Sequence, residues 1–103
     1  MIEVVSRSSA LNKIKEFSHV YILWSDPMCV SCGIMEERLQ GALRREQGPW
    51  RVFKVEKNKD TSLHPFDPAQ FPASFLFKGG VRSRVIPGLG TQGDIEICLR
   101  ELT

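Results

Sequence analysis

Two cysteines separated by two residues are the part of this sequence best suited to chemistry. They form the run Cys29-Val30-Ser31-Cys32. Two thiols at this spacing can close a disulfide across one helical turn, and a cysteine thiolate is both a nucleophile and a metal ligand. The run therefore predicts either thiol–disulfide chemistry or part of a metal site.

The segments on either side of the pair must position it. The nearly continuous apolar segment from His19 to Trp24 predicts a strand buried on both faces, and Asp26-Pro27 predicts a turn after it. A helix is predicted from Cys29 to about Glu46, with Met35, Leu39, Ala42 and Leu43 on its apolar face. Cys29 would then lie at a helix N-terminus, where unpaired N–H groups stabilise a thiolate and lower its pKa.

The remaining segments alternate between strand and helix patterns. We expect a short strand over 2–5, followed by a helix capped by Ser8 or Ser9, with Ala10, Leu11, Ile14 and Phe17 on one face. A strand is expected from Trp50 to Val55, and a hairpin over 74–86 with its turn at Gly79-Gly80. A last helix is expected from Thr91 or Gly93 to Leu102. Three prolines allow at most one helical turn between 60 and 72. This order indicates an α/β fold with helices on both faces of a mixed sheet.

Size and composition are those of an ordinary globular protein. The 103 residues fit one domain, 1–103, with 42% hydrophobic and 25% charged residues. No apolar run approaches the roughly 20 residues that span a bilayer, and the first 15 residues lack the apolar region of a signal peptide, so we expect a cytoplasmic protein without membrane contact. A net charge of +2 does not indicate a nucleic-acid partner. The basic residues between 44 and 59 are interrupted by acids, which favours a solvated face over an anion-binding patch.

The number of cysteines limits the metal hypothesis. Three cysteines cannot form a disulfide framework. Structural zinc requires four ligands, and beyond the pair the chain offers only Cys98, His19 and His64, far apart in sequence. We therefore predict no metal site within one chain; the alternative is a dimer that shares a zinc ion or iron–sulfur cluster between two pairs. Cys98 lies on the apolar face of the last helix and is predicted to be a core residue, with a regulatory or dimer-forming thiol as the alternative.

Four features, in this order, resemble the thioredoxin-like family over nearly the whole chain. They are the apolar strand that runs into C-x-x-C, the Phe71-Pro72 step, the hairpin that starts Ser74-Phe75-Leu76-Phe77-Lys78-Gly79-Gly80, and Gly88 before the closing helix. The resemblance implies a thioredoxin-like fold, a three-layer α/β/α arrangement with a central mixed sheet of four to five strands. It also implies that Pro72 follows a cis peptide bond and faces the cysteine pair.

The resemblance also implies roles at the site. Cys29, nearer the helix end, would be the catalytic nucleophile, and Cys32 would resolve the mixed disulfide by attacking Cys29. Phe71 would expose backbone groups that pair with an extended substrate. The expected substrate-binding residues are Met28, Val30, Ser31, Phe71, Pro72 and Gly88.

Three features depart from the family's pattern. No proline lies between the thiols, in a dipeptide that tunes the reduction potential of such proteins. The acid usually buried beneath the second cysteine is replaced by Ile22 or Leu23, so we expect proton transfer at Cys32 to use water or Asp26. Asp26-Pro27 adds a residue to the turn before the site. These departures motivate an alternative function, a non-catalytic thioredoxin-fold binding or adaptor module.

The leading hypothesis is a monomeric thiol–disulfide oxidoreductase. It would reduce or exchange disulfides of a protein or small-molecule substrate through a mixed disulfide. No bound cofactor is required, since the two sulfurs carry both electrons. An external reductant, either an enzyme like thioredoxin reductase or glutathione, would recycle the pair, and the reduction potential would set the direction of electron flow.

Overall fold

The chain alternates strands and helices in the predicted order. A computed structural model describes residues 2–57, 68 and 70–103, so most of the predicted loop from 60 to 72, with His64, lies outside the described residues. The elements are β1 (Glu3–Val4), α1 (Arg7–Glu16), β2 (His19–Ser25), α2 (Val30–Glu46), β3 (Arg51–Glu56), β4 (Ala73–Lys78), β5 (Val81–Pro87) and α3 (Gln92–Glu101). None of these helices is long and apolar enough to cross a membrane.

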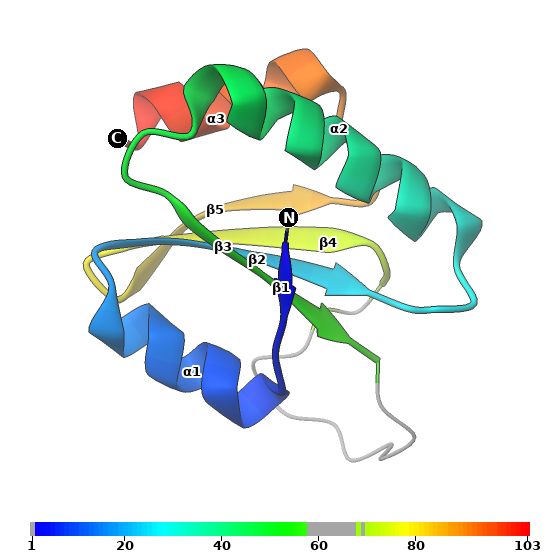
Figure 1. Ribbon diagram of the computed structural model, residues 1–103, viewed down its shortest axis with the longest axis horizontal. Coiled ribbons are helices and arrows are strands. Elements are labelled where there is room, and N and C mark those ends of the chain that lie inside the picture. The colour runs from blue at the N-terminus through cyan, green and yellow to red at the C-terminus, as the bar shows by residue number, and fades with distance from the viewer. Residues whose placement is uncertain (1, 58–67, 69) are drawn as a thin grey trace.

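The strands form one mixed sheet of five, in the order β1-β3-β2-β4-β5. β3 is parallel to both β1 and β2, whereas β4 is antiparallel to β2 and β5 is antiparallel to β4. Helix α1 covers one face of the sheet, and α2 and α3 cover the other (Figure 1). The three-layer α/β/α architecture expected from the sequence is therefore confirmed, with five strands in the sheet.

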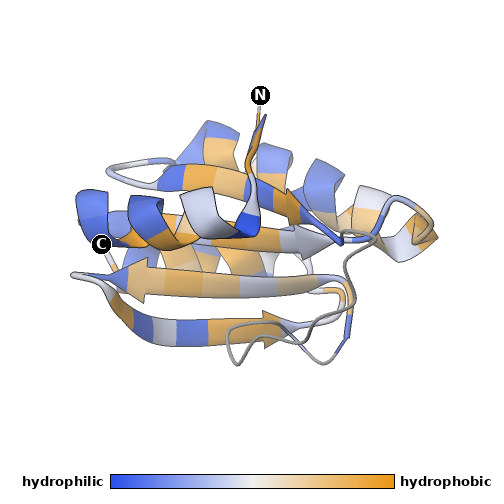
Figure 2. Ribbon diagram, turned by 90° about the horizontal axis from the view of Figure 1, so that it is seen from below, coloured by the Kyte–Doolittle hydropathy of each residue, from blue (hydrophilic) through white to orange (hydrophobic). Residues whose placement is uncertain are grey.

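The central strand β2 is apolar on both faces because each face meets a separate core. Tyr21 and Leu23 pack with residues of α2 and α3 such as Leu39. Ile22 and Trp24 belong to the cluster on the α1 side. The apolar character of the central strands is visible in Figure 2. Trp24, 5.8 Å from Phe75 between ring centroids, is thus a core residue of that cluster.

Several element ends differ from those expected. The cap of α1 is Ser6 and neither Ser8 nor Ser9, because Ser6 has the extended backbone of a cap and its side chain accepts a hydrogen bond from the Ser9 N–H. The first strand is shorter than 2–5, and Trp50 lies just before β3. The last helix begins at Gln92, between the two expected starts, with Thr91 as its N-cap.

Candidate active site

The turn between β2 and α2 places the first cysteine at the end of the helix. The Asp26 carboxylate accepts a hydrogen bond from the Met28 N–H at 3.0 Å, and the Asp26 carbonyl accepts one from the Cys29 N–H at 2.9 Å. An aspartate that binds its own backbone two residues on is a common way to stabilise such a turn. Cys29 is consequently the N-cap of α2, at the position predicted from the sequence.

The Cys29 sulfur lies among hydrogen-bond donors. It accepts from the Cys32 N–H at 3.3 Å and lies 3.2 Å from the Ser31 hydroxyl. The hydrogen bond from the Cys32 side chain, followed by that from Ser31, lowers the pKa of Cys29 below that of an ordinary thiol. Cys29 is also partly exposed. A thiol that is both exposed and easily ionised is chemically suited to nucleophilic attack.

Cys32 has the opposite environment. It is 1% exposed, and burial is the main cause that raises its pKa, with the hydrogen bond to Cys29 second. The Asp26 N–H, 3.5 Å from the Cys32 sulfur, and the Ser25 side chain partly offset this rise. The two thiols are free and interact, and their pKa values are shifted apart.

Asp26 contacts the Cys32 sulfur through its backbone. Its backbone N–H faces the Cys32 sulfur, whereas its carboxylate accepts from the Met28 N–H. Ser25, buried at the end of β2, was not foreseen as part of the site. The signal that could have revealed it is a hydroxyl at the end of an otherwise apolar buried strand, directly before the turn.

Two distant segments complete the surroundings of Cys29. The Phe71–Pro72 peptide bond is cis, and the Phe71 carbonyl lies 3.9 Å from the Cys29 sulfur. Pro72 is buried, and its carbonyl accepts a hydrogen bond from the Gly88 N–H at 2.9 Å. Gly88 has a φ of +64°, which glycine adopts without strain. The structure thus places Phe71 beside Cys29 and joins the adjacent Pro72 to Gly88.

Apolar side chains are exposed on both sides of the nucleophile in sequence. Met28 is 90% exposed and Val30 is 83% exposed. Leu89, next to Gly88, is 45% exposed. Lys57, which the sequence did not single out, places its ammonium 5.9 Å from the centre of the Phe71 ring. Exposed apolar groups such as Met28 and Val30 beside a reactive residue are typical of a surface that meets another molecule.

The other candidate residues have contacts of a different kind. His19 hydrogen-bonds with Ser18 at 2.9 Å, and its ring packs edge-on against Trp50. Cys98 is buried in the core as predicted, and Arg84 donates a hydrogen bond to its sulfur at 3.6 Å. Within the described part of the chain, no three His, Cys, Asp or Glu side chains are grouped so that they could hold a metal ion.

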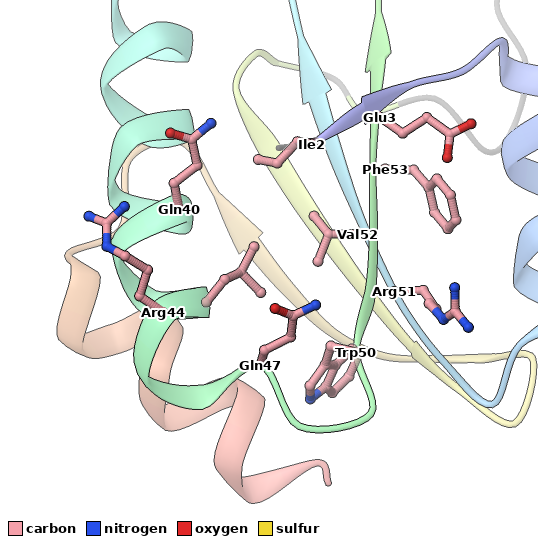
Figure 3. A pocket seen from close by; sticks show the side chains of 10 residues that line it. Ile2, Glu3, Gln40, Arg44, Gln47, Trp50, Arg51, Val52 and Phe53 are labelled. Atoms are coloured by element: carbon pink, nitrogen blue, oxygen red, sulfur yellow. The ribbon is translucent and has the colours of Figure 1, made fainter.

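A cavity of about 560 Å³ lies at the sheet edge, away from the thiols along α2. Its lining residues come from Ile2 and β1, from α2, from β3 and from the turn before β3, and none of them was predicted as a site residue. In Figure 3, Val52 and Arg51 lie on opposite sides of β3. The cavity therefore straddles the edge of the sheet and brings no group to the cysteine pair.

Comparisons with known proteins agree with this geometry at the level of the fold. No family model and no curated protein sequence matches the chain. Among solved structures, oxidised mitochondrial thioredoxin 3 of Saccharomyces cerevisiae is 18% identical with a TM-score of 0.75, over 98% of this chain and 95% of that one. A mutant thioredoxin of Halobacterium salinarum is 16% identical with a TM-score of 0.80 (98% and 91% covered). The protein Trxlp of Edwardsiella tarda is 21% identical with a TM-score of 0.79 (96% and 98% covered). The chain has a thioredoxin-like fold.

Proposed function

We propose that this protein is a thiol–disulfide oxidoreductase that uses Cys29 and Cys32. This proposal rests on the opposite environments of the two thiols: the partly exposed Cys29 sulfur accepts hydrogen bonds that lower its pKa, whereas burial raises the pKa of Cys32. Pairs of titratable groups whose pKa values are pushed apart are typical of sites where one group attacks first and the other acts later.

The reaction proceeds in two exchanges. The Cys29 thiolate attacks one sulfur of a substrate disulfide, which forms a mixed disulfide and releases the other substrate sulfur as a thiolate. Cys32 then loses its proton and attacks the Cys29 sulfur. The second substrate sulfur leaves as a thiolate, both substrate sulfurs become thiols, and the enzyme keeps a Cys29–Cys32 disulfide. Two electrons have moved from the enzyme to the substrate.

The surroundings of Cys29 would bind the substrate. The Phe71 carbonyl beside the nucleophile is suited to pair with the backbone of an extended segment, and the hydrogen bond from the Gly88 N–H to the Pro72 carbonyl fixes the residue that follows Phe71. Met28, Val30 and Ser31 would contact the groups that flank the substrate disulfide. We expect a disulfide-containing protein or small molecule as substrate, and a thioredoxin reductase-like enzyme or glutathione as recycling reductant, in the cytoplasm, with the protein a monomer.

Reduction of insulin in the presence of dithiothreitol tests this function. We expect Cys29→Ser to abolish the acceleration seen with the wild type, because the attacking thiolate is gone. Cys32→Ser, reduced and then freed of dithiothreitol before insulin is added, should instead accumulate a mixed disulfide with insulin, visible by mass spectrometry after alkylation. Cys98→Ser, which removes a thiol outside the site, is the matched control and should retain the wild-type rate. Equal rates for wild type and Cys29→Ser would contradict the proposal.

The adaptor hypothesis predicts that Cys29 has an ordinary thiol pKa and forms no disulfide with Cys32. The absence of an acid at Ile22 or Leu23 and of a proline between the cysteines motivates it. A Cys29 pKa near the ordinary thiol value of about 8.5, with no disulfide formed under mild peroxide, would indicate a binding module. The hydrogen bonds that lower the Cys29 pKa favour the oxidoreductase.

A further inference from the structure

Asp26 makes hydrogen bonds to three residues at the cysteine pair. Its carboxylate accepts from the Met28 N–H at 3.0 Å, and its carbonyl accepts from the Cys29 N–H at 2.9 Å. Its own N–H donates to the Cys32 sulfur at 3.5 Å. The turn runs from Asp26 to Cys29 with Pro27 in second place, and aspartate and proline are favoured at these two positions. The turn therefore fixes the Asp26 carboxylate to the residue that precedes Cys29.

The two polar ends of Asp26 act on different thiols. The hydrogen bond from the Cys32 side chain and that from Ser31 lower the pKa of Cys29, whereas the negative charge of Asp26 acts in the opposite direction. Burial raises the pKa of Cys32, whereas the Asp26 N–H acts in the opposite direction. Like charges disfavour each other, and a hydrogen bond to a thiolate favours it. Asp26 therefore opposes the ionisation of Cys29 and assists that of Cys32.

The other groups that face Cys29 come from α2 and from the segment before β4. On α2 they are the thiol of Cys32 and the hydroxyl of Ser31. Before β4 the Phe71 carbonyl lies 3.9 Å from the Cys29 sulfur, and the Lys57 ammonium lies 5.9 Å from the centre of the Phe71 ring. Among the side chains that the structure describes, the Asp26 carboxylate is the charged group that a hydrogen bond fixes next to Cys29.

We propose that Asp26 is a positioning residue that makes this protein a stronger reductant, because its fixed negative charge disfavours the Cys29 thiolate and with it the reduced form of the pair. This inference rests on the proposed function and gives the direction of electron flow, from the two thiols to the substrate disulfide. A dithiol whose reduced form is stabilised is an oxidant, so a charge that destabilises the thiolate lowers the reduction potential.

Asp26→Asn removes the charge and keeps the turn, because an asparagine oxygen can also accept from the Met28 N–H. Equilibration with glutathione measures the reduction potential: each glutathione disulfide takes two electrons and two protons from the protein thiols and becomes two thiols, while Cys29 and Cys32 form a disulfide. At about pH 9, above the ordinary thiol pKa of about 8.5, the variant should favour the reduced form more than the wild type does. We expect a factor of about two to five, the size of one charge acting through partly solvated surroundings, which corresponds to a rise of about 9–21 mV.

The pH dependence separates a charge effect from damage to the fold. A protonated Cys29 carries no charge for Asp26 to repel, so the difference in potential should shrink as the pH falls through the Cys29 pKa. The midpoint of Cys29 alkylation by iodoacetamide should move to lower pH in Asp26→Asn. Glu16→Gln is the matched control, since it removes one carboxylate at the end of α1, at the opposite end of β2 from the thiols. Neither the potential nor the midpoint should change in this control.

Three results would overturn the role of the Asp26 charge. They are an equal potential for wild type and Asp26→Asn, a difference in potential that does not vary with pH, and an unmoved alkylation midpoint. Asp26→Ala removes the hydrogen bond to Met28 as well as the charge, so a shift in Asp26→Ala that is absent from Asp26→Asn would assign the effect to the turn and likewise overturn the proposal. A wild type that forms no Cys29–Cys32 disulfide at any glutathione ratio would overturn the proposed function itself.

Discussion

The buried hydrogen bond between Tyr21 and Ser74 connects the strand that leads to the cysteines with the strand that follows Pro72. The Tyr21 hydroxyl donates to the Ser74 hydroxyl at 2.6 Å, and both residues are 0% exposed. Burial raises the pKa of Tyr21 above its ordinary value, so the phenol stays neutral. Since β2 and β4 carry the two halves of the candidate site, this bond should stabilise their relative placement.

Removal of one of these two hydroxyl groups should lower the free energy of unfolding more than removal of both. Tyr21→Phe leaves the Ser74 hydroxyl buried without its donor, and an unsatisfied buried polar group costs about 1–3 kcal/mol. Ser74→Ala leaves the phenol in the same situation, with a similar cost. The double variant leaves no buried hydroxyl without a hydrogen-bond partner at this point, so its free energy of unfolding should lie within about 1 kcal/mol of that of the wild type. For a domain of this size, each kcal/mol corresponds to a fall in Tm of about 4–8 °C.

Urea unfolding followed by tryptophan fluorescence measures all four proteins of this cycle. We expect a coupling free energy of about 1 kcal/mol or more between the two positions. Additive losses, or a Tyr21→Phe variant as stable as wild type, would show that the bond contributes nothing and would refute the reasoning. Insulin reduction by the same variants, measured at a temperature where each is folded, would report whether the strand pairing also affects the site.

Two further predictions concern the nucleophile and the core. Because the pKa of Cys29 is lowered, its alkylation by iodoacetamide should reach half its maximal rate at a pH below the ordinary thiol pKa of about 8.5. Ser31→Ala removes one hydrogen bond to the Cys29 sulfur and should move this midpoint to higher pH. An unmoved midpoint would exclude the Ser31 hydroxyl as a cause of the lowered pKa. Cys32, whose pKa is raised, should react only at more alkaline pH. Leu39→Ala truncates a fully buried side chain of α2 and should lower the free energy of unfolding in urea by about 2–5 kcal/mol. A loss below about 1 kcal/mol would mean that the surrounding core fills the space left by the removed side chain.

The local features of the site could be predicted from the sequence. Apolar periodicity and turn residues predicted the order of strands and helices, and the run from the apolar strand through Asp26-Pro27 placed Cys29 at a helix end. These features depend on neighbours within a few residues, whose preferences are expressed in the sequence itself. The exact cap of α1 was missed because several serines in a row can each serve as a cap, and only the backbone conformation distinguishes them.

The pairs that complete the site are separated by long stretches of chain. Cys29 meets Phe71 across 42 residues, Arg38 meets Gly90 across 52, and no spacing in the sequence indicates either contact. The resemblance to a known family predicted the first, but the second, and the contact of the Asp26 amide with the Cys32 sulfur, emerged only from the folded chain. Such contacts depend on strand order, register and helix packing, which arise from the sum of many weak interactions over the whole molecule. The amino-acid sequence therefore determined which group is reactive and where its helix begins, whereas the tertiary structure decided which distant groups surround it.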